Sequence, residues 1–262
     1  MAGQEIRFDD GAVYEKFMGV WSRSAGEVFL DWIAPQPSRS WLDVGCGNGA
    51  FTQLLCERVN PSRVMGVDPS GAQLEFARGR PGVSCASFVK GDALALPAED
   101  GSFDGAVMAL VIQFVPDPVR GVAEMVRAVR PGGCVAAYTW DLPGGGVPTQ
   151  LLYDELEALG AALLVPPSAD ATRLDAMHAL WSDAGLVDVE TRDIAVERTF
   201  AGFDDWWTIA TSGPISTAAI AALSAGARAQ LKATVRSRLT PGTEGRITCH
   251  ARAHAVKGRV PA

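Results

Sequence analysis

Apolar residues follow two alternating patterns along this chain. Short continuous runs predict buried strands, and these runs cover residues 40–44, 63–68, 86–89, 102–108 and 134–140. Apolar residues at helical spacing predict helices between them, over residues 11–33, 50–57, 71–78 and 118–129. Asp117-Pro118 starts the last of these helices, and Arg130-Pro131-Gly132-Gly133 ends it. This alternation predicts an α/β fold with a doubly wound parallel sheet.

The rest of the chain is less regular. We expect helices over residues 149–161 and 170–184, a strand able to pair antiparallel over 186–196, and a last strand over 246–257. Between those strands, residues 203–239 begin with aromatic residues and continue as an alanine-rich helix. This segment either covers the ligand site or packs on the sheet. We predict one domain over residues 1–262, with an N-terminal helical lid (1–37), a cofactor-binding core (38–140) and a C-terminal part (141–262) that contains a helical cap (202–240).

A glycine-rich loop joins the first strand to the next helix, in the stretch Asp43-Val44-Gly45-Cys46-Gly47-Asn48-Gly49. Glycine permits backbone angles, and a close ligand approach, that a Cβ atom would prevent. The free N–H groups at the start of the following helix favour acceptor atoms of a ligand. The loop therefore predicts the site of a nucleoside-bearing cofactor, although a tight turn that binds nothing has the same pattern.

Acidic residues follow three successive strands of the predicted sheet. They are Asp43, Asp68 and Asp92. In an open α/β sheet, ligands bind in the crevice outside the carboxyl ends of the strands, so these acids line one crevice. Asp68 can accept hydrogen bonds from both ribose hydroxyls, or it can cap the helix that begins after Pro69. Asp92 is placed to accept a hydrogen bond from an adenine amino group.

The composition of the chain argues against several classes of binding partner. The formal net charge of −7 argues against nucleic acid, because binding to a phosphate backbone needs a basic surface. The chain has no signal-peptide pattern and no apolar run that spans a bilayer, so we expect a cytoplasmic protein with no membrane partner. We expect a monomer or a homodimer. Five scattered cysteines without a CxxC pair predict reduced thiols. Cys249, His250 and His254 have no second ligand pair, and no metal is expected.

Two enzyme classes fit the loop, since Gly45-x-Gly47-x-x-Ala50 also matches the loose nicotinamide pattern. The ordered set of Asp43 to Gly49, Gly66-Val67-Asp68, Gly91-Asp92-Ala93 and Arg130-Pro131-Gly132-Gly133 resembles the class I S-adenosylmethionine-dependent methyltransferases over residues 38–140. A weaker likeness, over Tyr14 to Ser22 and Ala251 to Pro261, is to the small-molecule subgroup related to the ubiquinone-biosynthesis methyltransferases. The resemblance implies a seven-stranded, mostly parallel Rossmann-like sheet whose last strand is antiparallel.

The resemblance also implies roles for individual residues. Gly45, Cys46 and Gly47 would hold the methionine portion of S-adenosylmethionine, with Asp43 near its amino group. Leu110 and Val111 would approach the same portion. Asp68 would bind the ribose. Contacts with adenine would come from Pro69, Ser70, Gly91, Asp92 and Ala93, and the lid would contribute Tyr14, Met18 and Trp21.

The implied reaction displaces the methyl group of a sulfonium ion in line, mainly through positioning and desolvation. The candidate proton acceptors are Gln113, Tyr138 and Asp141. Many relatives carry a histidine in the segment of Gln113, so a histidine relay is not expected. The predicted substrate-lining residues are Gln113, Phe114, Trp140, Trp206 and Trp207, although each aromatic residue also suits the core. The alternatives are an NAD(P)-dependent oxidoreductase and a non-catalytic adenosyl-cofactor-binding protein.

Overall fold

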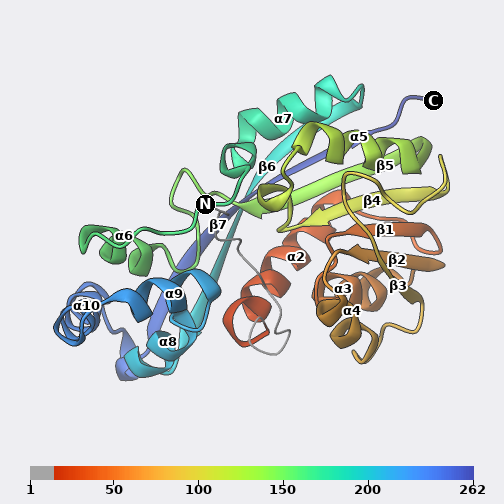
Figure 1. Cartoon of the computed structure of the whole chain (residues 1–262). Coiled ribbons are helices and arrows are strands. Elements are labelled where there is room, and N and C mark those ends of the chain that lie inside the picture. The colour runs from red at the N-terminus through yellow and green to blue at the C-terminus, as the bar shows by residue number, and fades with distance from the viewer. Residues whose placement is uncertain (1–14) are drawn as a thin grey trace.

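The computed structural model describes residues 15–262, and a seven-stranded sheet organises them (Figure 1). The strand order is β3-β2-β1-β4-β5-β7-β6. Strands β1 to β5 pair in parallel, whereas β7 is antiparallel to both of its neighbours, β5 and β6. The strand bounds are β1 Ser40–Val44, β2 Arg63–Asp68, β3 Ala86–Lys90, β4 Phe103–Ala109, β5 Val129–Trp140, β6 Val187–Phe200 and β7 Ile247–Arg259. The predicted fold class is confirmed, including the reversed last strand.

Helices cover both faces of the sheet and bury a separate core on each face. Successive strand residues point to opposite faces, so in β1 Trp41 joins one core and Leu42 the other. The core of Trp41 packs against α2 (Val20–Ile33) and α3 (Ala50–Val59), and the core of Leu42 packs against α5 (Pro118–Ala128) and α7 (Leu174–Asp183). Helix α4 (Gly71–Arg78) has a small cluster of its own with β3. The shorter helices are η1 (Glu15–Gly19), η2 (Ile112–Phe114), η3 (Ala169–Thr172) and η4 (Thr243–Gly245).

Four further helices gather around the far ends of β6 and β7 (Figure 1). They are α6 (Gln150–Ala158), α8 (Phe203–Ala210), α9 (Pro214–Ala222) and α10 (Ala225–Arg238). We call this group the cap. Its buried residues, such as Leu152 of α6 and Leu231 of α10, belong to the same core cluster as Trp41. The cap is therefore packed continuously with one face of the sheet.

Some element boundaries differ from the predicted ones. Residues 130–133, expected to separate a helix from a strand, lie within β5, where the pairing with β4 shifts its register between Phe103 and Gly105. The helix expected over 170–184 is divided, because Arg173 has an extended backbone between η3 and α7. Strand β6 continues to Phe200, where pairing with Ile247 of β7 extends it beyond the apolar run.

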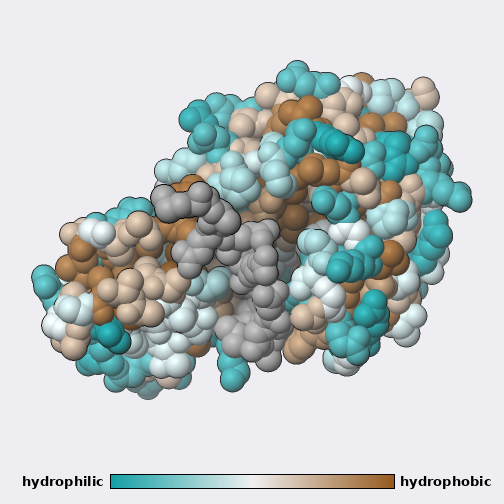
Figure 2. Space-filling view, viewed as in Figure 1, coloured by the Kyte–Doolittle hydropathy of each residue, from teal (hydrophilic) through white to brown (hydrophobic). Residues whose placement is uncertain are grey.

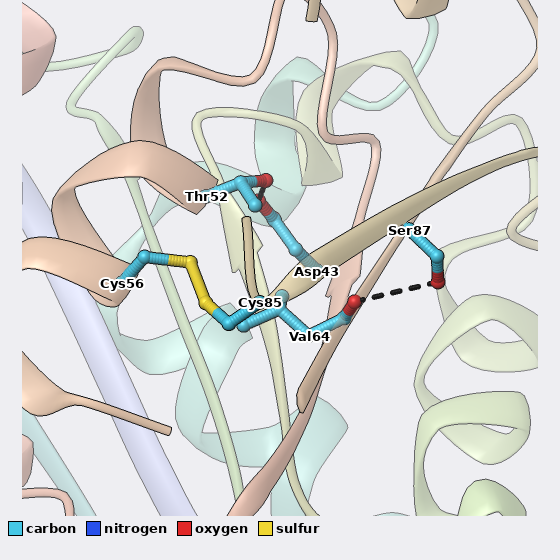
Figure 3. Close-up of a disulfide and its surroundings, with 6 residues drawn as sticks. All are labelled: Asp43, Thr52, Cys56, Val64, Cys85 and Ser87. Atoms are coloured by element: carbon cyan, nitrogen blue, oxygen red, sulfur yellow. Dashed lines mark hydrogen bonds between the residues drawn. A yellow bond between two sulfur atoms is a disulfide. The ribbon is translucent and has the colours of Figure 1, made fainter. Parts of the chain in front are cut away.

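The expectation that all five cysteines are reduced is wrong for one pair. Cys56 of α3 forms a disulfide with Cys85, directly before β3 (Figure 3). Their Cα atoms are 6.8 Å apart, although 29 residues separate them in sequence. Packing of the last turn of α3 beside the segment that leads into β3 brings the two thiols together, and this contact leaves no trace in the cysteine spacing. Cys46, Cys134 and Cys249 are free thiols.

Candidate functional site

The glycine loop has left-handed backbone at each of its three glycines. The φ angles are +74° at Gly45, +51° at Gly47 and +78° at Gly49, which directly precedes α3. Other residues are strained in this region, so the conformation explains the glycine spacing. The N–H groups of Gly45 and Cys46 both donate to the carbonyl oxygen of Val67, at 2.7 and 3.1 Å. This anchors the loop to the end of β2 and leaves the space beside Gly47 open, since a Cβ there would have no atom within 4 Å.

Residues leaving β4 pack directly against the loop. A Cβ at Gly45 would lie 2.5 Å from the Cγ1 atom of Val111, which is closer than two non-bonded carbon atoms approach each other. Leu110 before it has a φ of +63° and donates its N–H to the Tyr138 carbonyl oxygen at 2.8 Å. The structure thus brings Leu110 and Val111 to the predicted methionine-binding end of the loop.

Asp43 lies fully buried at the foot of the loop. One carboxylate oxygen, Oδ2, accepts a hydrogen bond from the Thr52 hydroxyl of α3 at 2.5 Å (Figure 3). The other oxygen, Oδ1, is buried without a hydrogen-bond partner among the described residues. Burial is the largest cause that raises the pKa of Asp43 to about 7, and the nearby charge of Asp68 adds to it. A cation beside Oδ1 would remove this penalty.

Asp68, the last residue of β2, holds the glycine loop in place. Its Oδ2 accepts from the Gly47 N–H at 2.9 Å, and its Oδ1 accepts from the Ser70 N–H at 2.8 Å. Burial raises the pKa of Asp68 above its usual value, against the effect of these two hydrogen bonds. Each carboxylate oxygen has a second acceptor site, so binding of ribose hydroxyls is compatible with both backbone contacts. The N-terminal cap of α4 is Ser70, whose hydroxyl accepts from Gln73, rather than Asp68.

Asp92 lies at the same edge but is more exposed. The Gly91 N–H donates to the Asp68 carbonyl oxygen at 3.2 Å, which places the segment after β3 beside the end of β2. Asp92 is exposed, and its Oδ1 accepts from the Leu94 N–H at 2.9 Å. Ala93 is partly buried. The three acids predicted to line one crevice thus lie at or directly after the carboxyl ends of three neighbouring strands, β1, β2 and β3.

Three polar residues that the sequence did not single out tie the N-terminal segment to the loop. The Glu15 carboxylate accepts from the Asn48 side-chain amide at 3.2 Å and forms an ion pair with Arg80. Arg80 donates from Nε to the Asn48 carbonyl oxygen at 2.6 Å. Met18 and Trp21, predicted for the lid, are buried, whereas Tyr14 lies outside the described residues. An arginine after a helix has no local signal of this role.

The three candidate proton acceptors are all engaged in structural contacts. The Gln113 amide donates to the Leu110 carbonyl oxygen at 2.9 Å and accepts from the Thr139 hydroxyl at 2.7 Å. Tyr138 is buried and donates its hydroxyl to the Ser22 carbonyl oxygen of α2 at 3.2 Å.

Asp141, the third candidate, connects β5 to β7. Its Oδ2 forms an ion pair with the Arg252 guanidinium, and the distance from Oδ2 to Arg252 Nε is 2.9 Å. Its Oδ1 accepts a hydrogen bond from the Gly144 N–H at 2.8 Å. Buried His254 lies 3.5 Å from the same Oδ2, and its Nδ1 atom is 2.8 Å from the Thr172 carbonyl oxygen. Within residues 15–262, no group of three or more His, Cys, Asp or Glu residues could hold a metal ion.

The predicted substrate-lining aromatic residues differ in exposure. Trp140 and Trp206 are buried in the core, while Phe114 and Trp207 are partly exposed. The Trp207 ring stacks on Phe203 of the same helix, with 5.8 Å between the ring centroids. The structure therefore brings Trp206 and Trp207 together in α8 of the cap and leaves Phe114 in η2, after β4.

Residues 42–137 match the family described as "Methyltransferase domain". The chain is 34% identical over 200 residues to trans-aconitate 2-methyltransferase of Acidovorax sp. (strain JS42), covering 76% of this chain and 71% of that enzyme. It is 32% identical over 133 residues to the ubiquinone/menaquinone biosynthesis C-methyltransferase UbiE of Ruegeria sp. (strain TM1040), covering 49% of this chain and 52% of that protein. The chain thus spans about half the length of this second relative. It also spans about half of a demethylmenaquinone methyltransferase of Deinococcus radiodurans.

The fold is similar to that of Haemonchus contortus phosphoethanolamine N-methyltransferase 2, solved in complex with phosphomonomethylethanolamine and S-adenosylhomocysteine. The TM-score is 0.58 at 18% identity, over 96% of this chain and 57% of that chain. None of the helices described for residues 15–262 is long and apolar enough to cross a membrane. The family match and the relatives of 30% identity or more favour methyl transfer over nicotinamide chemistry as the interpretation of the glycine loop. The chain belongs to the class I S-adenosylmethionine-dependent methyltransferases, with a core like that of the ubiquinone-biosynthesis enzymes, and its cofactor is S-adenosylmethionine.

Proposed function

We propose that this enzyme methylates a small organic molecule, and that it acts by holding the acceptor in line with the donor and excluding water. The observation that carries the proposal is the Asp43 Oδ1 atom, which is buried without a partner at the foot of a left-handed glycine loop. A buried carboxylate oxygen without a hydrogen-bond donor or a cation beside it costs free energy, unless a bound ligand supplies that partner.

The residues present fit the cofactor. The amino group of its methionine portion is a cation, and Asp43 is an acid with no cation beside it among the described residues. The open space at Gly47 leaves room for a ligand against the backbone. We assign Gly45, Cys46, Gly47, Leu110 and Val111 to the methionine portion, Asp68 to the ribose, and Pro69, Ser70, Gly91, Asp92 and Ala93 to the adenine.

The sulfonium cofactor supplies a methyl group that is already a strong electrophile. The chain therefore needs to orient the acceptor rather than to activate the donor, and orientation of this kind contributes about 7–11 kcal/mol in favourable cases. The contacts of Gln113, Tyr138 and Asp141 support this emphasis, because each side chain already serves a structural hydrogen bond or ion pair. We assign a general base to none of the three.

The arrangement of the lid and cap supports a small acceptor. Phe17 of η1 packs against Gly213, directly before α9, where a Cβ would lie 2.6 Å from the ring. Glu15 of the same segment contacts the glycine loop. The N-terminal segment thus touches both the cap and the cofactor loop, and we propose that these parts enclose the acceptor within a single methyltransferase domain. Apolar surface on the cap and in the centre of the same face (Figure 2) suits an organic molecule better than a nucleic acid.

The named activities of the relatives also support a small acceptor, since they include a trans-aconitate and a ubiquinone/menaquinone methyltransferase. The test has two steps. Calorimetry should first detect binding of S-adenosylhomocysteine to the wild-type chain but no binding of NADH. Transfer of labelled methyl from S-adenosylmethionine to a panel of small organic acids, quinols and amines should then detect a product. Absence of S-adenosylhomocysteine binding would contradict the proposal, and binding without any methylated product would favour a non-catalytic cofactor-binding protein.

A further inference from the structure

One face of the long β6–β7 ribbon is covered by the cap and is almost entirely apolar. Residues of β6 on this face alternate with exposed residues, and the covered positions are Ile194, Val196, Arg198 and Phe200. Ile194 and Val196 lie opposite Ala253 and Ala251 of β7, which are buried in the same core. Arg198 is the only charged side chain among the four. An arginine in such surroundings is normally paired.

Arg198 has no such partner within residues 15–262. Its Nη1 atom is buried without a hydrogen-bond partner, and its guanidinium lies 4.7 Å from the centre of the Phe200 ring. Its opposite residue on β7, Cys249, is already hydrogen-bonded to Trp206 of α8. Asp205 of α8 attracts the guanidinium through space but directs one carboxylate oxygen to the Ala201 N–H, at 3.0 Å.

Two cations of the cap are paired with an acid. Lys232 and Arg236 of α10 both contact Asp204, at 3.1 and 3.0 Å. The partly buried Nη1 group of Arg198 differs from them in having no hydrogen-bond partner among the described residues. Desolvation of the partly buried guanidinium lowers the pKa of Arg198, and this effect exceeds the opposing attraction of Asp205.

The position of Arg198 connects it to the lid. Phe200, under the guanidinium, lies 6.4 Å from the Trp21 ring of α2, measured between ring centroids. Phe17, one turn earlier, reaches Gly213 of the cap. Arg198 therefore lies where the lid, α8 and the β6–β7 ribbon meet, within the enclosure that we propose for the acceptor.

We propose that Arg198 binds a carboxylate of the methyl acceptor, so that the acceptor is an organic acid with an apolar body. This inference rests on the proposed function. A single guanidinium offers two parallel donors that match one carboxylate. A phosphate group carries up to two charges and three acceptor oxygens, and it would need further donors that this apolar face does not provide.

The test compares Arg198→Gln with Arg198→Lys, and with Arg192→Gln, which removes an exposed arginine of the same strand. Each protein, saturated with S-adenosylhomocysteine, is titrated with benzoate, succinate and citrate and with the corresponding amides, and binding is followed by tryptophan fluorescence. We expect the wild type to bind at least one acid in preference to its amide. Arg198→Gln should weaken that binding by about 10- to 150-fold, the range of a charge-assisted hydrogen bond. Arg198→Lys should lose less, and Arg192→Gln should match the wild type.

Two further measurements separate this role from a structural one. The melting temperature of ligand-free Arg198→Gln should equal or exceed that of the wild type, because the substitution removes an unpaired cation. Its affinity for S-adenosylhomocysteine should be unchanged. Equal binding of acids and amides, no binding of any acid by the wild type, or a lowered melting temperature of Arg198→Gln would overturn the inference. None of these results concerns the cofactor, whose failure to bind would count against the proposed function instead.

Discussion

The two halves of the sheet treat buried charge in opposite ways. In the half that contains β1, β2 and β3, acids lie at or directly after the strand ends, and backbone N–H groups donate to both carboxylate oxygens of Asp68. Among the charged side chains of the described residues, the buried atom without a hydrogen-bond partner in this half is an acceptor, Asp43 Oδ1. In the half formed by β6, β7 and the cap, it is a donor, Arg198 Nη1. The contrast matches a cationic cofactor on one side and, as we propose, an anionic acceptor on the other.

Replacing Asp68 should weaken cofactor binding more than any other substitution considered for the β1–β4 half of the sheet. Asp68→Ala removes the proposed ribose contacts and also the anchor of the Gly47 N–H. At about 1.5–3 kcal/mol for each charged hydrogen bond, affinity for S-adenosylhomocysteine should fall by about a hundredfold or more in calorimetry. Asp92→Ala, at an exposed acid of the same edge, should cost clearly less. Equal losses of affinity in the two variants would contradict the assignment of the ribose contacts to Asp68.

Replacing Gly45 should reveal how tightly the loop is packed. Gly45→Ala adds a Cβ at 2.5 Å from Val111 and forces alanine to a φ of +74°. We expect a loss of about 2–4 kcal/mol in the free energy of unfolding, from left-handed backbone strain plus overpacking, measured by urea denaturation. Gly71→Ala, where a Cβ meets nothing within 4 Å, is the matched control and should unfold like the wild type. If Gly45→Ala unfolded at the same urea concentration as the wild type, the loop would be free to move away from Val111.

The charge on Asp43 should make cofactor affinity depend on pH. Burial raises the pKa of Asp43 to about 7, so the carboxyl is largely protonated at pH 6 without a ligand. Affinity for S-adenosylhomocysteine should therefore rise about fivefold between pH 6 and pH 7 and about tenfold between pH 6 and pH 8, where it levels off, and Asp43→Asn should abolish this dependence.

The same group has the opposite effect on stability. The folded state holds the Asp43 proton at pH values where the unfolded chain has released it, so the free energy of unfolding falls as pH rises from about 4 to about 7. Urea denaturation of wild type and Asp43→Asn across this range measures the contribution. A parallel pH profile in the two proteins would mean that another group is responsible.

Breaking the contact between Glu15 and the glycine loop should have the smallest effect. Arg80→Met removes the ion pair with Glu15 and the hydrogen bond to the Asn48 carbonyl oxygen, while keeping a side chain of similar length. Because Glu15 is partly exposed, we expect only about a three- to tenfold weaker affinity for S-adenosylhomocysteine. Arg173→Met breaks an exposed pair with Asp175 elsewhere and should leave that affinity unchanged.

The cofactor half could be predicted well from the sequence because its determinants are local. The strand over residues 63–68 and the helix over residues 71–78 have the predicted bounds, and the left-handed angles of Gly45 and Gly47 explain the spacing of the loop. The role of each site residue stays a prediction that the variants above address.

The other features depend on contacts between distant segments. Nothing near Cys56 indicates that Cys85 will lie beside it, and Arg80 reaches Glu15 across 65 residues. The alternation of β6 does place Arg198 on its covered face, but its lack of a partner depends on α8 and β7. Local patterns therefore describe the donor site better than the acceptor site.

The position of β7 has a consequence for the order of folding. Strand β6 pairs with β7 alone among the described strands, yet three of the four cap helices, α8, α9 and α10, separate the two in sequence. During synthesis, β1 to β5 can pair as each emerges, whereas β6 and its cap must wait for β7 to fill the gap beside β5. Contacts between residues so far apart form slowly. We therefore expect the part of the sheet formed by β1 to β5 to assemble first and the proposed acceptor enclosure to close as the last step of folding.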